Sequence, residues 1–152
     1  MIRRHPLLAL FTVAYLALVG WVTLGPQPLD GEGQALLWRA LRFLARREQT
    51  SWLDYGTVEF ASNVLMFVPI GLLFLLLLDL RRWWLAILLG VALTCGIEFT
   101  QQFLPTRVAD PRDLLSNSIG AAIGVLVGLV WGGIGLLRDR ARSRRPAVAA
   151  RG

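Results

Sequence analysis

Several polar and charged side chains lie inside or directly beside long apolar stretches of this sequence, where each is costly unless it has a partner. The set combines amides, carboxylic acids and one arginine: Asn63, Glu98, Gln101, Arg107, Asp110, Asp113 and Asn117. Amides donate and accept hydrogen bonds, carboxylates accept them or act as general bases, and a guanidinium can hold a carboxylate or a phosphate. These residue types predict hydrogen bonding and ion pairing first, and acid–base chemistry second.

Several other chemistries are excluded by the residues that the sequence lacks. All 16 basic residues are arginines, so no P-loop lysine, Schiff-base lysine or Ser-Lys dyad can form. His5 is the only histidine, which makes a catalytic triad improbable and leaves a histidine zinc site without its second ligand. Cys95 is the only cysteine, so the chain holds no internal disulfide and no CxxC motif. We therefore assign no catalytic residue, no metal ligand and no cofactor.

The elements that must position these side chains are membrane-spanning helices. Of 152 residues, 55% are hydrophobic and only 17% are charged, and the mean hydropathy is +0.56. Four stretches approach or exceed the length of about 20 apolar residues that spans a bilayer: 7–24, 60–78, 83–104 and 114–137. The first is too long for a signal-peptide core and lacks a cleavage site, so we expect it to be retained. The predicted fold is an all-α, four-span membrane protein.

Alternation of the spans brings the polar residues to one face of the membrane. The start of the second span, the end of the third and the start of the fourth must lie on the same side, whichever way the chain is inserted. Glu98 then lies roughly 9 Å below the surface, and Asn63 and Asn117 roughly 5 Å. We expect one shallow recess there, in which Arg107 is the best partner for the carboxylate of Glu98.

The arginines predict the orientation of the chain. Ten lie in the N-terminus, the second loop and the tail, and six lie in the other two loops, which places both termini in the cytoplasm. Residues 138–152 form an arginine-rich tail that we expect to be disordered. The basic charge of this tail is explained better by the membrane surface than by nucleic acid. The first loop, 25–59, is expected to contain an amphipathic helix that lies on the outer leaflet or packs on the end of the bundle.

The fourth span carries small residues at every fourth position. Ser116, Gly120, Gly124, Gly128 and Gly132 form a smooth stripe on one helical face. Another helix can approach closely there, either from the same chain or, through Gly120, Gly124 and Gly128, from a partner protein.

The spacing of the polar residues resembles that of the VanZ-like family of membrane proteins. The segments that carry the resemblance lie between Glu59 and Gly132, and they are N-x5-P-x-G from Asn63, E-x2-Q from Glu98, and R-x2-D-x2-D-x3-N-x2-G from Arg107. The resemblance implies a small envelope protein with several spans, and the founding member is associated with low-level resistance to the glycopeptide teicoplanin. It also implies that the family's polar positions fall on the seven residues named at the outset.

Three functions are compatible with this pattern. The first is a recess on the outer face of the cytoplasmic membrane that binds an anionic or glycosylated, lipid-linked envelope component and so influences glycopeptide susceptibility. The second is an intramembrane enzyme that acts on a lipid-linked substrate through an acidic general base, or through a magnesium site formed by Asp110, Asp113 and Glu98. The third is a structural role, either as an assembly partner or with the polar residues serving only to fasten the helices together.

Overall fold

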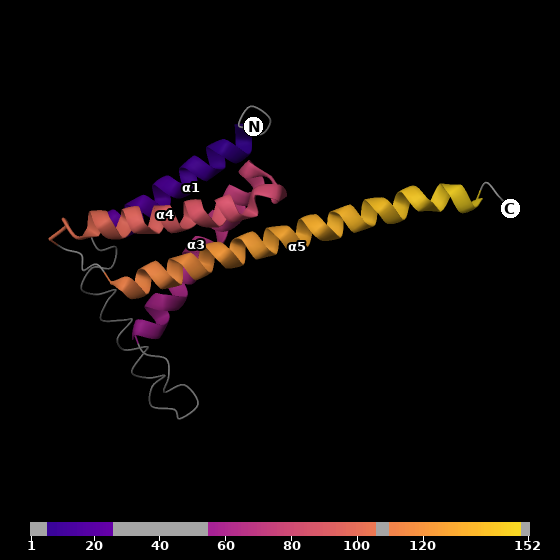
Figure 1. Cartoon of the computed structure of the whole chain (residues 1–152). Coiled ribbons are helices and arrows are strands. Elements are labelled where there is room, and N and C mark those ends of the chain that lie inside the picture. Colours follow the sequence, from indigo (N-terminus) through magenta and orange to yellow (C-terminus); the bar gives the residue numbers. More distant parts are fainter. Residues whose placement is uncertain (1–5, 26–54, 106–109, 150–152) are drawn as a thin grey trace, which may run out of the picture.

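The computed structural model describes residues 6–25, 55–105 and 110–149, and every regular element in these ranges is helical. The four long helices are α1 (Pro6–Leu24), α3 (Tyr55–Leu78), α4 (Trp83–Gln101) and α5 (Pro111–Ala149), and a short 3-10 helix, η3 (Leu80–Arg82), joins α3 to α4. In Figure 1 the helices form one bundle, from which the C-terminal part of α5 projects. The prediction of an all-α fold is confirmed.

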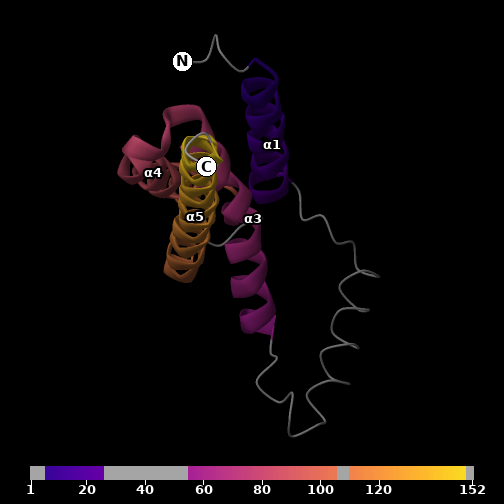
Figure 2. The same ribbon diagram turned by 90° about the vertical axis from the view of Figure 1, so that its right-hand side faces the viewer.

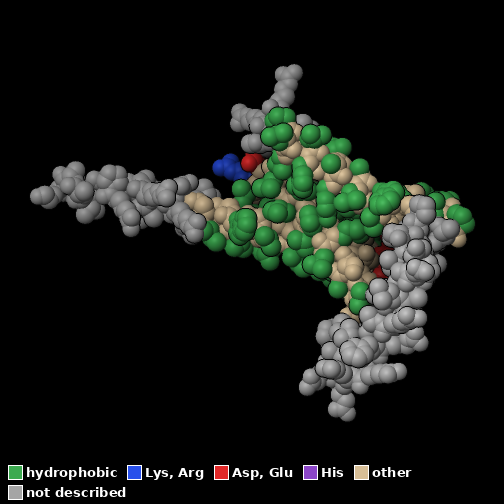
Figure 3. Space-filling model, turned by 180° about the vertical axis from the view of Figure 1, so that it is seen from behind, with side chains coloured by type: hydrophobic (Ala, Val, Ile, Leu, Met, Phe, Trp, Pro, Cys, Tyr) green, Lys and Arg blue, Asp and Glu red, His purple; other side chains and the backbone are tan. Residues whose placement is uncertain are grey.

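All four long helices can cross a membrane by length and composition. The candidate spans are Pro6–Leu24, Gly56–Leu78, Leu80–Gln101 and Pro111–Gly135. Large apolar side chains point outward from the bundle, including Leu65 at 70% and Trp131 at 74% exposure. Figure 3 shows this apolar coat covering most of one face, with charged side chains at its ends. Such a surface is unfavourable in water and favourable in lipid, so the chain is a multi-pass membrane protein.

Close packing of α3 against α5 forms the centre of the bundle. A Cβ atom at Gly120 or Gly124 would overlap a backbone carbonyl of α3, that of Val64 or Val68, and one at Gly71 would overlap the carbonyl of Ala121. Gly128 faces leucine side chains of α3 and Gly132 faces Leu80 in the same way. The smooth stripe of the fourth span is therefore in contact with α3 of the same chain, the first of the two arrangements that the sequence allows.

Helices α1 and α4 complete the bundle on the sides of this pair. A buried cluster joins all four helices through Val19, Phe67, Ile70, Ile97 and Ala121. In Figure 2, α1 and α5 lie on different sides of α3. This arrangement places the C-terminal ends of α1 and α4 beside the N-terminal ends of α3 and α5.

Each predicted span corresponds to one long helix, although several helix ends differ by a few residues, and the largest difference is at the C-terminus. The third span ends at Gln101 rather than at residue 104, and α3 and α5 begin at Tyr55 and Pro111 rather than at 60 and 114. The tail from residue 138 was expected to be disordered, whereas α5 continues to Ala149. Residues 136–145 contain neither glycine nor proline and are mostly arginine and leucine, which favours continuation of the helix beyond residue 137, and Pro146 lies only in its last turn. The amphipathic helix expected in the first loop falls mainly on residues 26–54, outside the described residues.

Candidate functional site

A cavity of about 180 Å³ lies where the ends of all four helices meet. Its lining residues are Val22, Thr23, Glu59, Ser62, Asn63, Met66, Ile97, Glu98, Gln101, Asp113 and Asn117. Five of the seven residues predicted from the sequence are in this set: Asn63, Glu98, Gln101, Asp113 and Asn117. Asp110 lies beside it, in a smaller hollow with Arg112, and Arg107 falls outside the described residues. We refer to the larger cavity as the polar recess.

The start of α5 places one wall of the polar recess. Asp110 precedes the helix and its carboxylate accepts the backbone N–H of Arg112 at 2.9 Å, as an N-cap residue does. Pro111 occupies the first helical position, where its missing N–H costs nothing. This cap fixes the first turn, so that Asp113 faces α3 and accepts a hydrogen bond from Nδ2 of Asn63 at 2.7 Å. An amide–carboxylate bond therefore joins α3 to α5 at the rim of the recess.

Two further amide side chains join the other helices. Nδ2 of Asn117 donates to Oγ1 of Thr94 at 2.9 Å, which links α5 to α4. Nε2 of Gln101 donates to the backbone carbonyl of Thr23 at 3.0 Å, which links α4 to α1. The side-chain oxygens of both amides, Gln101 Oε1 and Asn117 Oδ1, are buried and receive no hydrogen bond. Each amide nitrogen is thus bonded, whereas each amide oxygen is buried without a donor.

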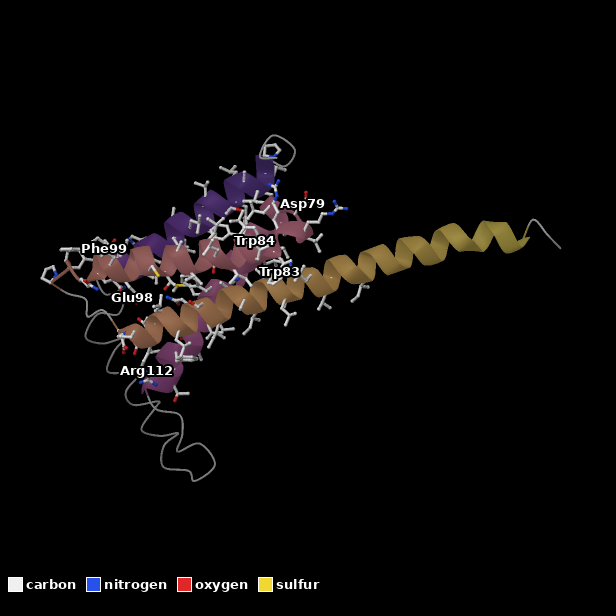
Figure 4. The ribbon with its side chains drawn as sticks, in the orientation of Figure 1. Asp79, Trp83, Trp84, Glu98, Phe99 and Arg112 are labelled. Carbon is white, nitrogen blue, oxygen red and sulfur yellow. The ribbon has the colours of Figure 1, made fainter. Side chains whose placement is uncertain are left out.

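Among the described residues, carboxylates outnumber cations at this end of the bundle. Glu59, Glu98, Asp110 and Asp113 interact electrostatically with one another, since Asp113 is within range of the other three. Glu98 also accepts a hydrogen bond from the backbone N–H of Asp110. In the described part of the chain, Arg112 is the one cation at this end, and it lies in the small hollow that Glu59, Asp110 and Asp113 also line. Figure 4 shows Glu98 and Arg112 at the same end of the bundle.

The opposite end of the bundle has a different character. Figure 4 shows Asp79, Trp83 and Trp84 there, near the junction between α3 and α4. All three are exposed, as are Arg81 and Arg82. Tryptophans next to arginines are typical of the membrane–water interface. The polar recess and this interface therefore mark the two faces of the membrane.

Sequence reasoning missed the contribution of α1 to the polar recess. Thr23 lines it and supplies the carbonyl that Gln101 binds, while its own hydroxyl donates to the carbonyl of Val19 at 2.8 Å. A threonine at the end of an apolar run gives no chemical signal of its own. The rule of alternating faces would have found it, because the end of the first span must lie on the same side as the start of the second. The same rule applies to Ser62, one residue before Asn63.

No group of three histidine, cysteine or acidic side chains in the described ranges is arranged to hold a metal ion. The acidic magnesium site considered from the sequence is therefore not formed by the residues that the structure describes. The recess can act chemically as a set of hydrogen-bond acceptors with a negative potential. Its apolar wall, formed by Val22, Met66 and Ile97, can contact the non-polar part of a ligand.

A helical membrane protein with several spans and a polar recess at one face is the class that the fold and the site define. The chain belongs to the VanZ/LLP1 family, whose model it matches over residues 11–132. The match includes α1 from residue 11 onward, all of α3 and α4, and α5 as far as residue 132. No curated protein and no solved structure matches the chain.

Proposed function

We propose that the protein binds the polar head of an envelope component in the polar recess and thereby influences the susceptibility of the cell to glycopeptides such as teicoplanin. The observation that carries this proposal is the convergence of four helices on one cavity in which buried acceptors lack donors. A purely structural network would be expected to satisfy its own buried groups, because an unpaired buried acceptor is costly. A bound molecule would supply the missing donors.

Of the ligands predicted from the sequence, anionic or glycosylated, the described lining favours the glycosylated one. It supplies carboxylates and amide oxygens, which accept hydrogen bonds and repel anions. Hydroxyl or amine groups fit such a lining, so the ligand class is a glycosylated or amine-bearing headgroup rather than an exposed phosphate. The apolar wall and the lipid-facing surface suit a headgroup that is attached to a lipid.

The proposed function also requires that the polar recess opens on the outer face of the membrane. The arginine distribution favours both termini in the cytoplasm of a cell with this protein in its cytoplasmic membrane. With α1 starting in the cytoplasm, its C-terminal end and the polar recess lie at the outer face. That is the face on which glycopeptides and lipid-linked envelope precursors meet.

The test is native mass spectrometry of the protein extracted with its surrounding lipid. Glu98→Gln removes one negative charge from the recess while keeping an acceptor for the N–H of Asp110, and Asp79→Asn removes one at the opposite face as a matched control. We expect one envelope component to remain bound at one-to-one stoichiometry to the wild type and to Asp79→Asn, and to be depleted from Glu98→Gln. Identical bulk lipids on all three proteins would contradict the proposal and favour a structural role for the polar residues.

A further inference from the structure

The strongest unexplained feature of the polar recess is its pair of unsatisfied amide oxygens. Gln101 is 7% exposed and Asn117 is 3% exposed, and both line the cavity. A backbone carbonyl can only accept a hydrogen bond, so the contact with Thr23 fixes the orientation of the Gln101 amide, with its nitrogen bound and its oxygen free. Gln101 Oε1 is therefore a buried acceptor without a donor, and Asn117 Oδ1 is a second one when the Asn117 amide donates to Thr94, as it does in this structure.

The same cavity holds three carboxyl groups, those of Glu59, Glu98 and Asp113. Like charges repel one another more strongly at a partly buried site than in water, and a cation between them relieves that repulsion. Each amide nitrogen of the recess already uses one of its two N–H donors on Asp113, Thr23 or Thr94, so fewer donors than acceptors are left for a ligand. Arg112, which lines the smaller hollow, interacts favourably with Glu59 and Asp113 but is not a lining residue of the polar recess. Within the described lining of the recess, acceptors and negative charge are therefore in excess, and a positively charged donor would complement both.

We propose that the polar recess binds a primary ammonium group. The inference rests on the proposed function and specifies the group that the recess recognises. A primary ammonium carries one positive charge and three N–H donors on a small centre, which matches a carboxylate together with two amide oxygens. A volume of about 180 Å³ accommodates such a group with the few atoms that join it to the rest of the ligand.

Two other kinds of cation fit the recess less well. The described residues form no group of three acidic side chains arranged for a metal ion. A quaternary ammonium offers no N–H donor and is recognised through aromatic rings, and none of the residues that line the cavity is aromatic. The lining therefore discriminates in favour of an unmethylated amine.

The same ammonium chemistry can come from two sources at a membrane surface. One is the headgroup of an aminophospholipid. The other is the free amino group of an amino sugar on an envelope glycan. The experiment below separates them.

Full-length protein in nanodiscs is compared in matched lipids that differ only in methylation of the headgroup nitrogen. We expect phosphatidylethanolamine to be retained about tenfold more strongly than phosphatidylcholine of the same acyl chains, because full methylation removes three N–H bonds to charged and polar acceptors. Competition by soluble glucosamine, with no effect of N-acetylglucosamine, would support the ammonium site and assign it to an amino sugar.

Variants at one position sharpen the test. Gln101→Met removes the free oxygen and should abolish the preference for the unmethylated lipid. Gln101→Lys places an ammonium of the chain itself in the recess, so it should exclude the amine ligand while raising the melting temperature above that of Gln101→Met. Asp79→Asn, at the opposite face, should retain the wild-type preference.

Two results would overturn the inference. Equal retention of the two lipids, or a preference for anionic phosphatidylglycerol, with a ligand still bound in a Glu98-dependent way, refutes the ammonium group and leaves the proposed function standing. If no lipid and no sugar is retained above the level found for Glu98→Gln, the proposed function fails together with the inference.

Discussion

Asn63 and Asp113 are 50 residues apart in the sequence, and Nδ2 of Asn63 donates to Oδ1 of Asp113 at 2.7 Å. The bond joins α3 to the first turn of α5 at the rim of the polar recess. It gives Asp113 one strong donor beside Asp110, which repels its charge, and Arg112, which attracts it. A hydrogen bond to a charged group is worth about 1.5–3 kcal/mol.

The first prediction tests this bond by replacing its donor. Asn63→Asp sets two carboxylates face to face and should lower the free energy of unfolding by about 2 kcal/mol or more at neutral pH. Acidification to a pH at which one carboxyl is protonated should recover part of the loss, because that carboxyl can then donate to the other. The measurement is thermal unfolding in one detergent across pH. As a control, Ser62→Ala removes a hydroxyl that bonds only within its own helix and should change little. A loss for Asn63→Asp that does not vary with pH would contradict the prediction.

The second prediction concerns the contact between α3 and α5. Gly124→Ala would place a methyl group on the carbonyl oxygen of Val68, so the two helices must separate and stability should fall by about 1–3 kcal/mol. Gly133→Ala is the matched control, since a Cβ there meets nothing within 4 Å and alanine favours the helix. The melting temperatures of both variants in the same detergent test this. Equal values would show that the glycine is not required for close approach.

The third prediction concerns the attachment of α1. The hydroxyl of Tyr15 donates to the backbone carbonyl of Met66 at 2.9 Å, three residues before Pro69, which interrupts the hydrogen bonds of α3. Tyr15→Phe keeps the ring and removes the bond, so it should cost about 1 kcal/mol. Thr12→Val provides the control, because that hydroxyl bonds within α1 to the carbonyl of Leu8. If Tyr15→Phe is no more destabilising than Thr12→Val, the contact does not hold α1 to the bundle.

The spans and the convergence of the polar residues were predictable because both follow from lipid physics. A polar side chain in an apolar run is costly wherever it is, and alternation of the spans fixes which ends meet. The amide of Asn63, the carboxyl of Glu98 and the amide of Asn117 could be placed in one layer without any knowledge of contacts. The family match agrees with the resemblance that these same residues carry.

The partners of those residues were not predictable in the same way. Arg107, the expected partner of Glu98, lies outside the described residues, so this pairing stays a prediction. The partner that the structure gives Glu98 is the backbone N–H of Asp110. The residue types show which side chains can form hydrogen bonds. A backbone N–H is available at every residue except proline, however, and only the fold determines which of them lies next to a given side chain. The role of Thr23 could not be predicted for the same reason, because its backbone carbonyl rather than its side chain accepts the hydrogen bond from Gln101.

The last prediction fixes the face on which the polar recess opens. Arg81 and Arg82 are exposed beside Trp83 and Trp84 at the end of the bundle opposite the recess, as expected of the cytoplasmic face. Alkaline phosphatase fused after Gly31 should therefore be active, and a fluorescent protein fused after Gly152 should fluoresce. Changing Arg81 and Arg82 together to Glu removes the positive charge of the second loop and should reduce the correctly oriented fraction, while Asp79→Asn should not. An active phosphatase after Gly152 would place the recess in the cytoplasm and remove it from the envelope components that it is proposed to bind.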